Sequence, residues 1–369
     1  MTLISRAREK GEIKAARELV RLKVDQSQPI NIFSVIEQAG IWLLFQPLKD
    51  LQGVYLKDSE SGRHLIVINS RRPLSLQRLT AAHEYGHHVL GHEASLDHAA
   101  DVEPSDTHIA QEAAAQTFAN DFLMPPQLVN TQWNSLELPT QPRLLQAHQA
   151  YLLSLYLGVS YRALIYQLIA LRRIDKPTAN RLAKYQPRQI KQLIGRGIGP
   201  LDSFADIWPL AQEDNGRQIQ TRVNDEVNIA LPEIPSTGYR WTITSPQVTD
   251  LSTEIAASQD KMTAKTILAA RISPGIPLAL LSDDFDGASS RDDYAGSGGH
   301  RYLNFRIAES GDFVLRLDLI RPWQSQGASV GTFEVKINST RQTTGDVGNG
   351  PREEVKQGLA HSLTSGQGE

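Results

Sequence analysis

Hydrophobic positions follow two different periods along this chain, and the period changes near residue 195. Before that point, apolar residues recur every three or four positions, which predicts amphipathic helices. We expect helices at 4–24, 32–39, 76–90, 109–123, 144–157 and 161–171, with shorter ones beginning at Pro177 and Pro187. Asn31 and Ser160 are the predicted N-caps of two of these helices. The apolar runs 41–45 and 64–68 predict two short strands.

Beyond a predicted linker at Gly197, Gly199 and Pro200, the period becomes two. Residues 313–320 and 333–337 alternate apolar and polar side chains, and 239–243, 266–272 and 302–307 are further candidate strands. Several short strands separated by Gly, Pro and Asp turns predict an all-β sandwich. The tail, residues 339–369, has six glycines and no aromatic residue, and we expect it to be disordered.

Composition sets limits on the class of protein. A length of 369 residues suggests two or three domains, and 40% hydrophobic with 21% charged residues excludes wholesale disorder. The absence of cysteine excludes disulfides, thiolate nucleophiles and cysteine-ligated metal sites. No apolar run predicts a membrane span and no secretory signal is visible, so the expected location is the cytoplasm.

Histidines concentrate in one segment, where six of the ten lie between His83 and His108. His83 and His87 stand four apart on a predicted helix, so both side chains can reach one metal ion. Glu84 lies beside that face and is the predicted general base, because zinc acidifies a bound water whose proton a carboxylate can accept. This pattern predicts a metal-assisted attack on a peptide carbonyl.

A third protein ligand is expected, since catalytic zinc usually has three and keeps one position open. The candidates are His92, His98, Asp101, Asp106, His108 and Glu112. Glu112 is favoured, because the small residues that follow it would let its helix approach the first helix closely. The alternative for Glu112 is an ordinary solvated helix residue.

Three groups of motifs stand in order within residues 1–195. They are Ile68-Asn69 with Pro73, then Leu79 to His87 with Gly91-His92, and finally Glu112 with Phe118-Ala119 and Leu123-Met124-Pro125. These motifs resemble the ImmA/IrrE family of zinc metallo-endopeptidases. The resemblance implies an α+β zincin-like core at 1–135, a helical subdomain at 136–197, one Zn²⁺ held by His83, His87 and Glu112, and Glu84 as base. Family members often cleave helix-turn-helix repressors, which implies a repressor-like substrate.

The helical segment 141–200 carries ten Lys/Arg and one acid, a net charge of +9 in a chain of net charge −3. Residues 152–168, with a turn at 157–160, resemble a helix-turn-helix, so a DNA contact is one hypothesis. Tyr161, Arg162, Tyr166 and Gln167 sit among many apolar residues there, which is a poor base-reading face. The favoured alternative is that this segment completes the peptidase or docks an acidic protein surface.

Three loops stand out between residues 205 and 338. The first contains Thr237 and Gly238, the second Gly298 and Gly299, and the third Arg321, Pro322 and Trp323. Glycines allow close backbone approach, and an exposed Trp beside Pro makes a rigid anchor. In this order, on a β-sandwich, the loops resemble the chagasin family of cysteine-peptidase inhibitors. The resemblance implies an immunoglobulin-like fold whose three loops enter the cleft of a papain-like enzyme.

The sequence therefore predicts a multidomain protein, an α+β zinc endopeptidase followed by an all-β immunoglobulin-like sandwich that inhibits, senses or docks a peptidase. One alternative is a regulator whose zinc domain is a binding module and whose helical block contacts DNA or a repressor. Another is a latent protein that stays inactive until the β domain binds its target.

Overall fold

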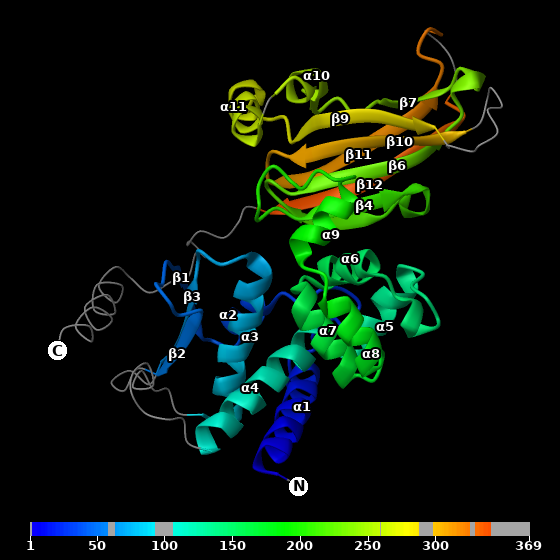
Figure 1. The fold of residues 1–369 in the computed structure, drawn as a ribbon. Helices are drawn as coiled ribbons and strands as arrows, with labels where there is room; N and C mark the ends of the chain where they lie inside the picture. The colour runs from blue at the N-terminus through cyan, green and yellow to red at the C-terminus, as the bar shows by residue number, and fades with distance from the viewer. Residues whose placement is uncertain are drawn as a thin grey trace. The chain divides into compact units, whose positions relative to one another are not determined.

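A computed structural model describes residues 2–57, 63–92, 106–258, 260–287, 298–324 and 329–340 (Figure 1). The chain divides into two compact units. Among the described residues, the first comprises those before 146 together with Leu153–Ala183, and the second comprises Gln146–Leu152 and residues 184–340. Helix α6 (Ala147–Leu157) is therefore shared, with its first half in the second unit.

The first unit combines helices with a small sheet, as expected. Its helices are α1 (Leu3–Arg21), α2 (Ile32–Gln38), α3 (Leu74–Leu90), α4 (Asp106–Leu123), α5 (Pro126–Ser135), α7 (Tyr161–Ala170) and α8 (Lys176–Ala183). Its strands are β1 (Trp42–Gln46), β2 (Gly53–Lys57) and β3 (His64–Asn69), in the order β1-β3-β2, with β1 parallel and β2 antiparallel to β3. The predicted caps are confirmed: Asn31 accepts a hydrogen bond from the Ser34 amide and Ser160 from the Ala163 amide.

Glycine brings three helices of this unit close together. A Cβ on Gly11 of α1 would lie 2.3 Å from the Ala114 carbonyl oxygen of α4. A Cβ on Gly86 of α3 would lie 2.9 Å from the Phe118 ring and 3.2 Å from the Ala115 carbonyl oxygen of α4. Helix α4 consequently packs closely against both α1 and α3, which sets the distance between the side chains that α3 and α4 present to each other.

The second unit is an all-β sandwich with added helices. Its strands are β4 (Ile207–Ala211), β5 (Gln218–Arg222), β6 (Glu226–Glu233), β7 (Arg240–Ile243), β8 (Val248–Asp250), β9 (Leu278–Gly287), β10 (Gly299–Ile307), β11 (Gly311–Ile320) and β12 (Gly331–Thr340). They form a five-stranded sheet, β4-β6-β10-β9-β8, and a four-stranded sheet, β5-β12-β11-β7. The predicted alternation is confirmed on β11 and β12, where Leu315, Leu317, Phe333, Val335 and Ile337 are buried.

One predicted strand is wrong. Residues 266–272 belong mostly to helix α11 (Lys261–Arg271), which follows α10 (Ser252–Ala256). The Asp260 side chain caps α11 by accepting a hydrogen bond from the Thr263 amide, and Ala264 and Leu268, four residues apart, form its buried face. The β-branched and apolar residues after Lys265 obscured this helical spacing. The sequence also assigned no element to β2 and α5 in the first unit, or to β4, β5, β6, β8, β9 and α10 in the second.

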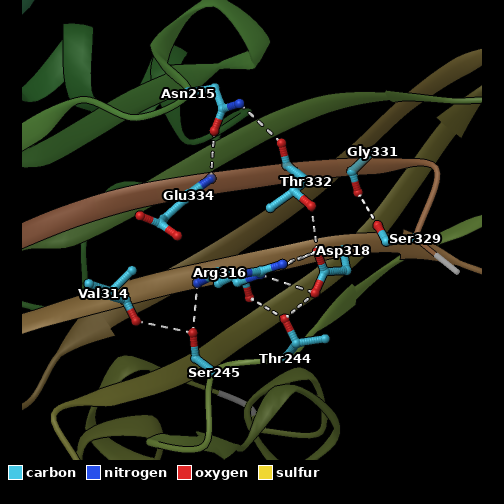
Figure 2. A network of polar contacts seen from close by, with 10 residues as sticks. All are labelled: Asn215, Thr244, Ser245, Val314, Arg316, Asp318, Ser329, Gly331, Thr332 and Glu334. Carbon is cyan, nitrogen blue, oxygen red and sulfur yellow. Dashed lines mark hydrogen bonds and ion pairs between the residues drawn. The ribbon is translucent and has the colours of Figure 1, made fainter.

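A polar network joins strands on one face of the four-stranded sheet (Figure 2). The buried carboxylate of Asp318 on β11 accepts hydrogen bonds from the hydroxyls of Thr332 on β12 (2.7 Å) and Thr244 after β7 (2.8 Å), and from the guanidinium of Arg316. Asn215 adds a bridge, because its amide group pairs with the backbone of Thr332 and Glu334 (Figure 2). These bonds fix β11, β12 and the end of β7 in one register.

In the described part of the chain, no single helix is long and apolar enough to cross a membrane. Helices α6 and α7 reach the necessary length and hydropathy only as a pair, and they are bent by 95° relative to each other. The predicted disordered tail lies outside the described residues, except that Ser339 and Thr340 complete strand β12.

Candidate metal centre

Helix α3 presents two histidines on one face. It begins after Pro73 and ends at Gly91, whose left-handed backbone (φ 71°) closes the last turn. Because His83 and His87 are one turn apart, their Nε2 atoms come within 3.0 Å of each other. The predicted helix and the predicted convergence of these two side chains therefore both appear in the structure.

Helix α4 brings Glu112 to the same point. Its carboxylate oxygens lie 3.1 Å from His83 Nε2 and 3.3 Å from His87 Nε2. The hydrogen bonds from these two histidines hold the pKa of Glu112 far below its ordinary value. This approach depends on the small residues at the helix contact, Gly86 on α3 and Ala115 on α4.

The donor set fits a metal ion. One ligand atom from each of His83, His87 and Glu112 lies within 4.8 Å of the other two. Two imidazole nitrogens this close cannot both be protonated, because their hydrogen atoms would collide. Both nitrogens and the carboxylate can, however, coordinate one cation. Two histidines and one carboxylate form a ligand set that suits catalytic zinc and leaves a coordination position open.

Glu84 lies beside this cluster and is half-buried. Burial raises the pKa of its carboxyl, although the neighbouring His83 and His87 act in the opposite direction. The backbone of Tyr55 on β2 also forms a hydrogen bond to the Glu84 carboxylate, which lowers the pKa. Glu84 is thus a carboxylate positioned next to a candidate metal ion and restrained by an adjacent strand.

The other candidates for the third ligand do not join the cluster in the described structure. His108 lies on the same helix as Glu112, and its Nε2 is 3.9 Å from the Glu112 carboxylate. Asp106 stands at the first position of α4. His98 and Asp101 lie outside the described residues.

His92, one of the candidate third ligands, lies beside the cluster and not in it. Its Nδ1 lies 3.0 Å from the Nδ1 of His87, on the side of the ring opposite to the cluster. Burial and the nearby His87 lower the pKa of His92 to about 4, so the neutral ring can accept a hydrogen bond. His92 is thus placed to orient His87 rather than to bind the same ion. The left-handed turn at Gly91 produces this contact, and helical spacing alone does not predict it.

Tyr55, His64 and His88 form an aromatic cluster that the sequence did not predict. The Tyr55 hydroxyl lies 2.7 Å from His64 Nδ1 and 3.1 Å from His88 Nδ1. These contacts join β2, β3 and α3. No local signal predicted them, because β2 was not recognised as a strand.

The three loops of the second unit come together as the resemblance implied. The Arg321 guanidinium donates a hydrogen bond to the Thr237 carbonyl and lies over the Tyr239 ring. A Cβ on Gly238 would lie 2.7 Å from the Trp323 ring, so only glycine lets the indole approach the backbone there. The indole is still 69% exposed.

The second loop contacts the first. A Cβ on Gly298 would lie 3.3 Å from the side chain of Ile234, and Ile234 is itself 49% exposed. Gly299 begins β10 and pairs with the end of β6. The loops therefore form one edge, with apolar side chains directed to the outside.

The helix-turn-helix hypothesis gains little from the structure. On α7, Tyr161 and Gln167 are buried, and Gln167 donates a hydrogen bond to Asp121. The exposed pair, Arg162 and Tyr166, interact with each other through a cation–π contact. Two of the four expected base-reading side chains are thus used inside the protein.

The comparisons agree with both resemblances. Residues 36–169 match the family model of the IrrE N-terminal-like domain (peptidase family M78), and residues 220–337 match that of the chagasin family peptidase inhibitor I42. The predicted resemblance to both families is confirmed, as is the architecture of a helical region with a small sheet followed by an all-β domain of chagasin-like fold. No curated protein matches the chain.

Three solved structures are similar to part of the chain. The cysteine protease inhibitor EhICP2 from Entamoeba histolytica is 18% identical, with a TM-score of 0.27, and the match covers 37% of this chain and 97% of that one. Amebosin is 20% identical, with a TM-score of 0.24 and coverage of 37% and 98%. PbICP-C, solved in complex with falcipain-2, is 11% identical, with a TM-score of 0.20 and coverage of 39% and 95%.

Proposed function

We propose that the N-terminal part of the chain is a zinc-dependent endopeptidase. One Zn²⁺ per chain would be held by His83, His87 and Glu112, with Glu84 as the general base. The convergence of these three ligands within the segment that matches the peptidase family is the observation that carries the proposal. The segments 1–135 and 136–197 would be its core and helical subdomain, and its location would be the cytoplasm.

Each residue has a defined task in this proposal. Zinc, when bound, supplies a Lewis acid that polarises the scissile carbonyl and acidifies water. Glu84 accepts the proton of the attacking water and returns it to the leaving amine. The Tyr55 backbone restrains the Glu84 carboxylate, and the His92 ring forms a hydrogen bond with Nδ1 of His87, which orients the His87 ring. A restrained base needs little rearrangement to reach the reacting atoms.

The proposed substrate class is a regulatory protein of the helix-turn-helix repressor type. The support for it is the match to the IrrE N-terminal-like domain. The structure also leaves exposed cations in the helical segment, such as Arg172, Lys176 and Lys184, which suit an acidic protein surface.

The test uses the full chain with Glu84→Gln and Glu112→Ala. Glu84→Gln keeps the shape and all three ligands, so we expect unchanged zinc content by mass spectrometry and no cleavage of a repressor encoded beside the gene. Glu112→Ala removes a ligand oxygen, so zinc affinity should fall as well. An active Glu84→Gln protein would refute the assignment of the base. If wild type binds no zinc and cleaves nothing, the regulator alternative replaces the enzyme.

A second function is favoured by the loop edge of the second unit. We propose that Thr237, Gly238, Gly298, Gly299, Arg321, Pro322 and Trp323 line a surface that binds, and through binding inhibits, a papain-like cysteine peptidase. The exposed indole packed over Gly238 supports this, because a rigid aromatic anchor at a protein edge is typical of binding hot spots. The domain would span residues 205–338.

The full chain should be titrated against a panel of papain-like enzymes. We expect Trp323→Ala to weaken binding at least tenfold, since truncating such an anchor costs about 2 kcal/mol or more. Val314→Ala is the matched control, because Val314 is an exposed apolar residue on β11 that is not part of the loop edge. If no enzyme in the panel is inhibited at micromolar concentration, the domain is a docking or sensor module instead.

A further inference from the structure

A cationic cavity lies within the second unit, apart from the loop edge. Its volume is about 770 Å³, and it is formed by α9 (Pro187–Ile194), the segment 197–203 and the first turns of α11. Four of its lining residues are cations, namely Arg188, Lys191, Lys261 and Lys265. Among the described residues that line it, none is acidic.

The nearby carboxylates are engaged elsewhere. Asp260 caps α11 through the Thr263 amide, and Asp202 accepts a hydrogen bond from the Phe204 amide. Asp206 forms ion pairs with Lys191 (2.9 Å) and with Arg222. Among the described residues, Arg188, Lys261 and Lys265 have no ion-pair partner, so the positive charge around the cavity is only partly balanced.

Two of the four cations are held in place from within the fold. The buried Lys191 ammonium donates to the Ala205 carbonyl (2.6 Å), and the Lys261 ammonium donates to the Gly199 (2.9 Å) and Pro200 (2.7 Å) carbonyls. These bonds hold Ala205 against α9, and Gly199 and Pro200 against α11. Within the described structure, Arg188 and Lys265 form no hydrogen bond or ion pair, so their donors are available to a ligand.

The remaining lining is apolar. Ile198 and Met262 are 71% and 75% exposed, and Leu201 and Pro187 add further apolar surface. A cavity of this volume lies in the range of pockets that hold organic ligands, roughly 300–1,000 Å³, and is much larger than an inorganic phosphate requires. Clustered Lys and Arg select phosphate or carboxylate groups, while exposed apolar side chains favour a ring or a base.

We propose that this cavity binds a small phosphorylated organic anion of the size of a nucleotide. Its phosphates would lie between Arg188 on α9 and Lys265 on α11, with Lys261 alongside. Its organic part would cover Ile198 and Met262. The site is independent of the candidate metal centre, and nothing in the proposed peptidase or inhibitor function requires it.

Calorimetric titration of the full chain with ATP, and separately with inorganic pyrophosphate, tests the proposal. We expect ATP to bind, and pyrophosphate to bind at least tenfold more weakly because it has no part that covers the apolar lining. Binding should weaken at about 1 M salt, where the screening length falls to about 3 Å. Failure of ATP to bind at low salt would overturn the proposal, and equal affinity for pyrophosphate would overturn its organic part.

The double variant Arg188→Ala/Lys265→Ala locates the site. Both side chains are exposed and make no internal bonds among the described residues, so the fold should survive, and thermal unfolding checks this. We expect at least a tenfold loss of ATP affinity. The control Lys176→Ala/Lys336→Ala removes the same charge from exposed positions on α8 and β12 and should leave affinity unchanged. Equal losses in both double variants would show a general charge effect and overturn the site. Binding of a DNA duplex through Arg188 and Lys265 without ATP binding would also overturn it.

Discussion

The contact between α1 and α4 gives a prediction that links stability to the candidate metal centre. Gly→Ala inside a helix ordinarily stabilises it by about 1 kcal/mol. At Gly11 the new Cβ would lie 2.3 Å from the Ala114 carbonyl oxygen and 3.2 Å from the Phe118 amide nitrogen. Both atoms belong to the backbone of α4, so no side chain can rotate away, and the helices must separate by roughly 1 Å to restore an ordinary contact.

We therefore expect Gly11→Ala to destabilise the first unit. Overpacking of this kind costs about 1–3 kcal/mol, which outweighs the gain in helix propensity or at least cancels it. Ala114 is two residues from Glu112, and metal–ligand distances in protein sites agree with standard values to within about 0.2 Å. A displaced α4 should thus also lower zinc affinity, by at least tenfold.

Hydrogen–deuterium exchange in peptides from α1 and α4 measures the stability of the first unit without a contribution from the second unit. Competition with a chelator measures the zinc affinity. Gly287→Ala is the control, because its new Cβ would meet only the Phe285 ring at 3.7 Å. Slower exchange in α1 of the Gly11→Ala variant would refute the reasoning, since helix propensity would then have outweighed the contact.

Three further predictions concern single side chains. His92→Ala should lower zinc affinity by about 10–100-fold without removing a ligand, measured by chelator competition, because it leaves the outer nitrogen of His87 without its partner. Asp318→Asn should make the free energy of unfolding of the second unit fall less steeply as the pH is lowered, which denaturant unfolding at a series of pH values measures. Burial raises the Asp318 pKa, but hydrogen bonds from Thr332, Thr244 and Arg316 outweigh it and lower the pKa below 3.8, so the stability this group contributes is present above that pH and is lost as pH falls. Tyr151→Phe should cost about 1–3 kcal/mol in urea unfolding, because it leaves the buried Ile207 amide without the hydroxyl as acceptor. An unchanged zinc affinity, an unchanged pH dependence or an unchanged midpoint, respectively, would contradict these expectations.

Much of the candidate site followed from helical spacing. His83, Glu84 and His87 lie within one and a half turns, so a single correct helix fixes their relation. Glu112 required a second helix and a reason for close approach, and the small residues after it supplied one. The contact itself depends on Gly11 and Gly86, whose role only the packed structure shows.

Features that depend on nonlocal contacts were not predictable in this way. His92 reaches His87 only because the backbone turns to the left at Gly91. The Tyr55 backbone reaches Glu84 only because β2 pairs with β3, a contact between strands that are separated along the chain. In the second unit, α11 was taken for a strand, because burial against Leu251 and Leu281 rather than local propensity decides which residues face inward.

The shared helix α6 has a consequence for how the two units can be separated. Tyr151, from its first half, donates to Asp206, and Lys191 of α9 pairs with the same carboxylate. Asp206 is therefore held by residues that come both before and after Leu153–Ala183, a stretch that belongs to the other unit, and its amide donates to Asp225. No single proteolytic cut can therefore release the inhibitor-like unit complete. A fragment beginning near residue 205 leaves Asp206 without two of its partners, so we expect the two proposed activities to be kept and degraded together in one polypeptide.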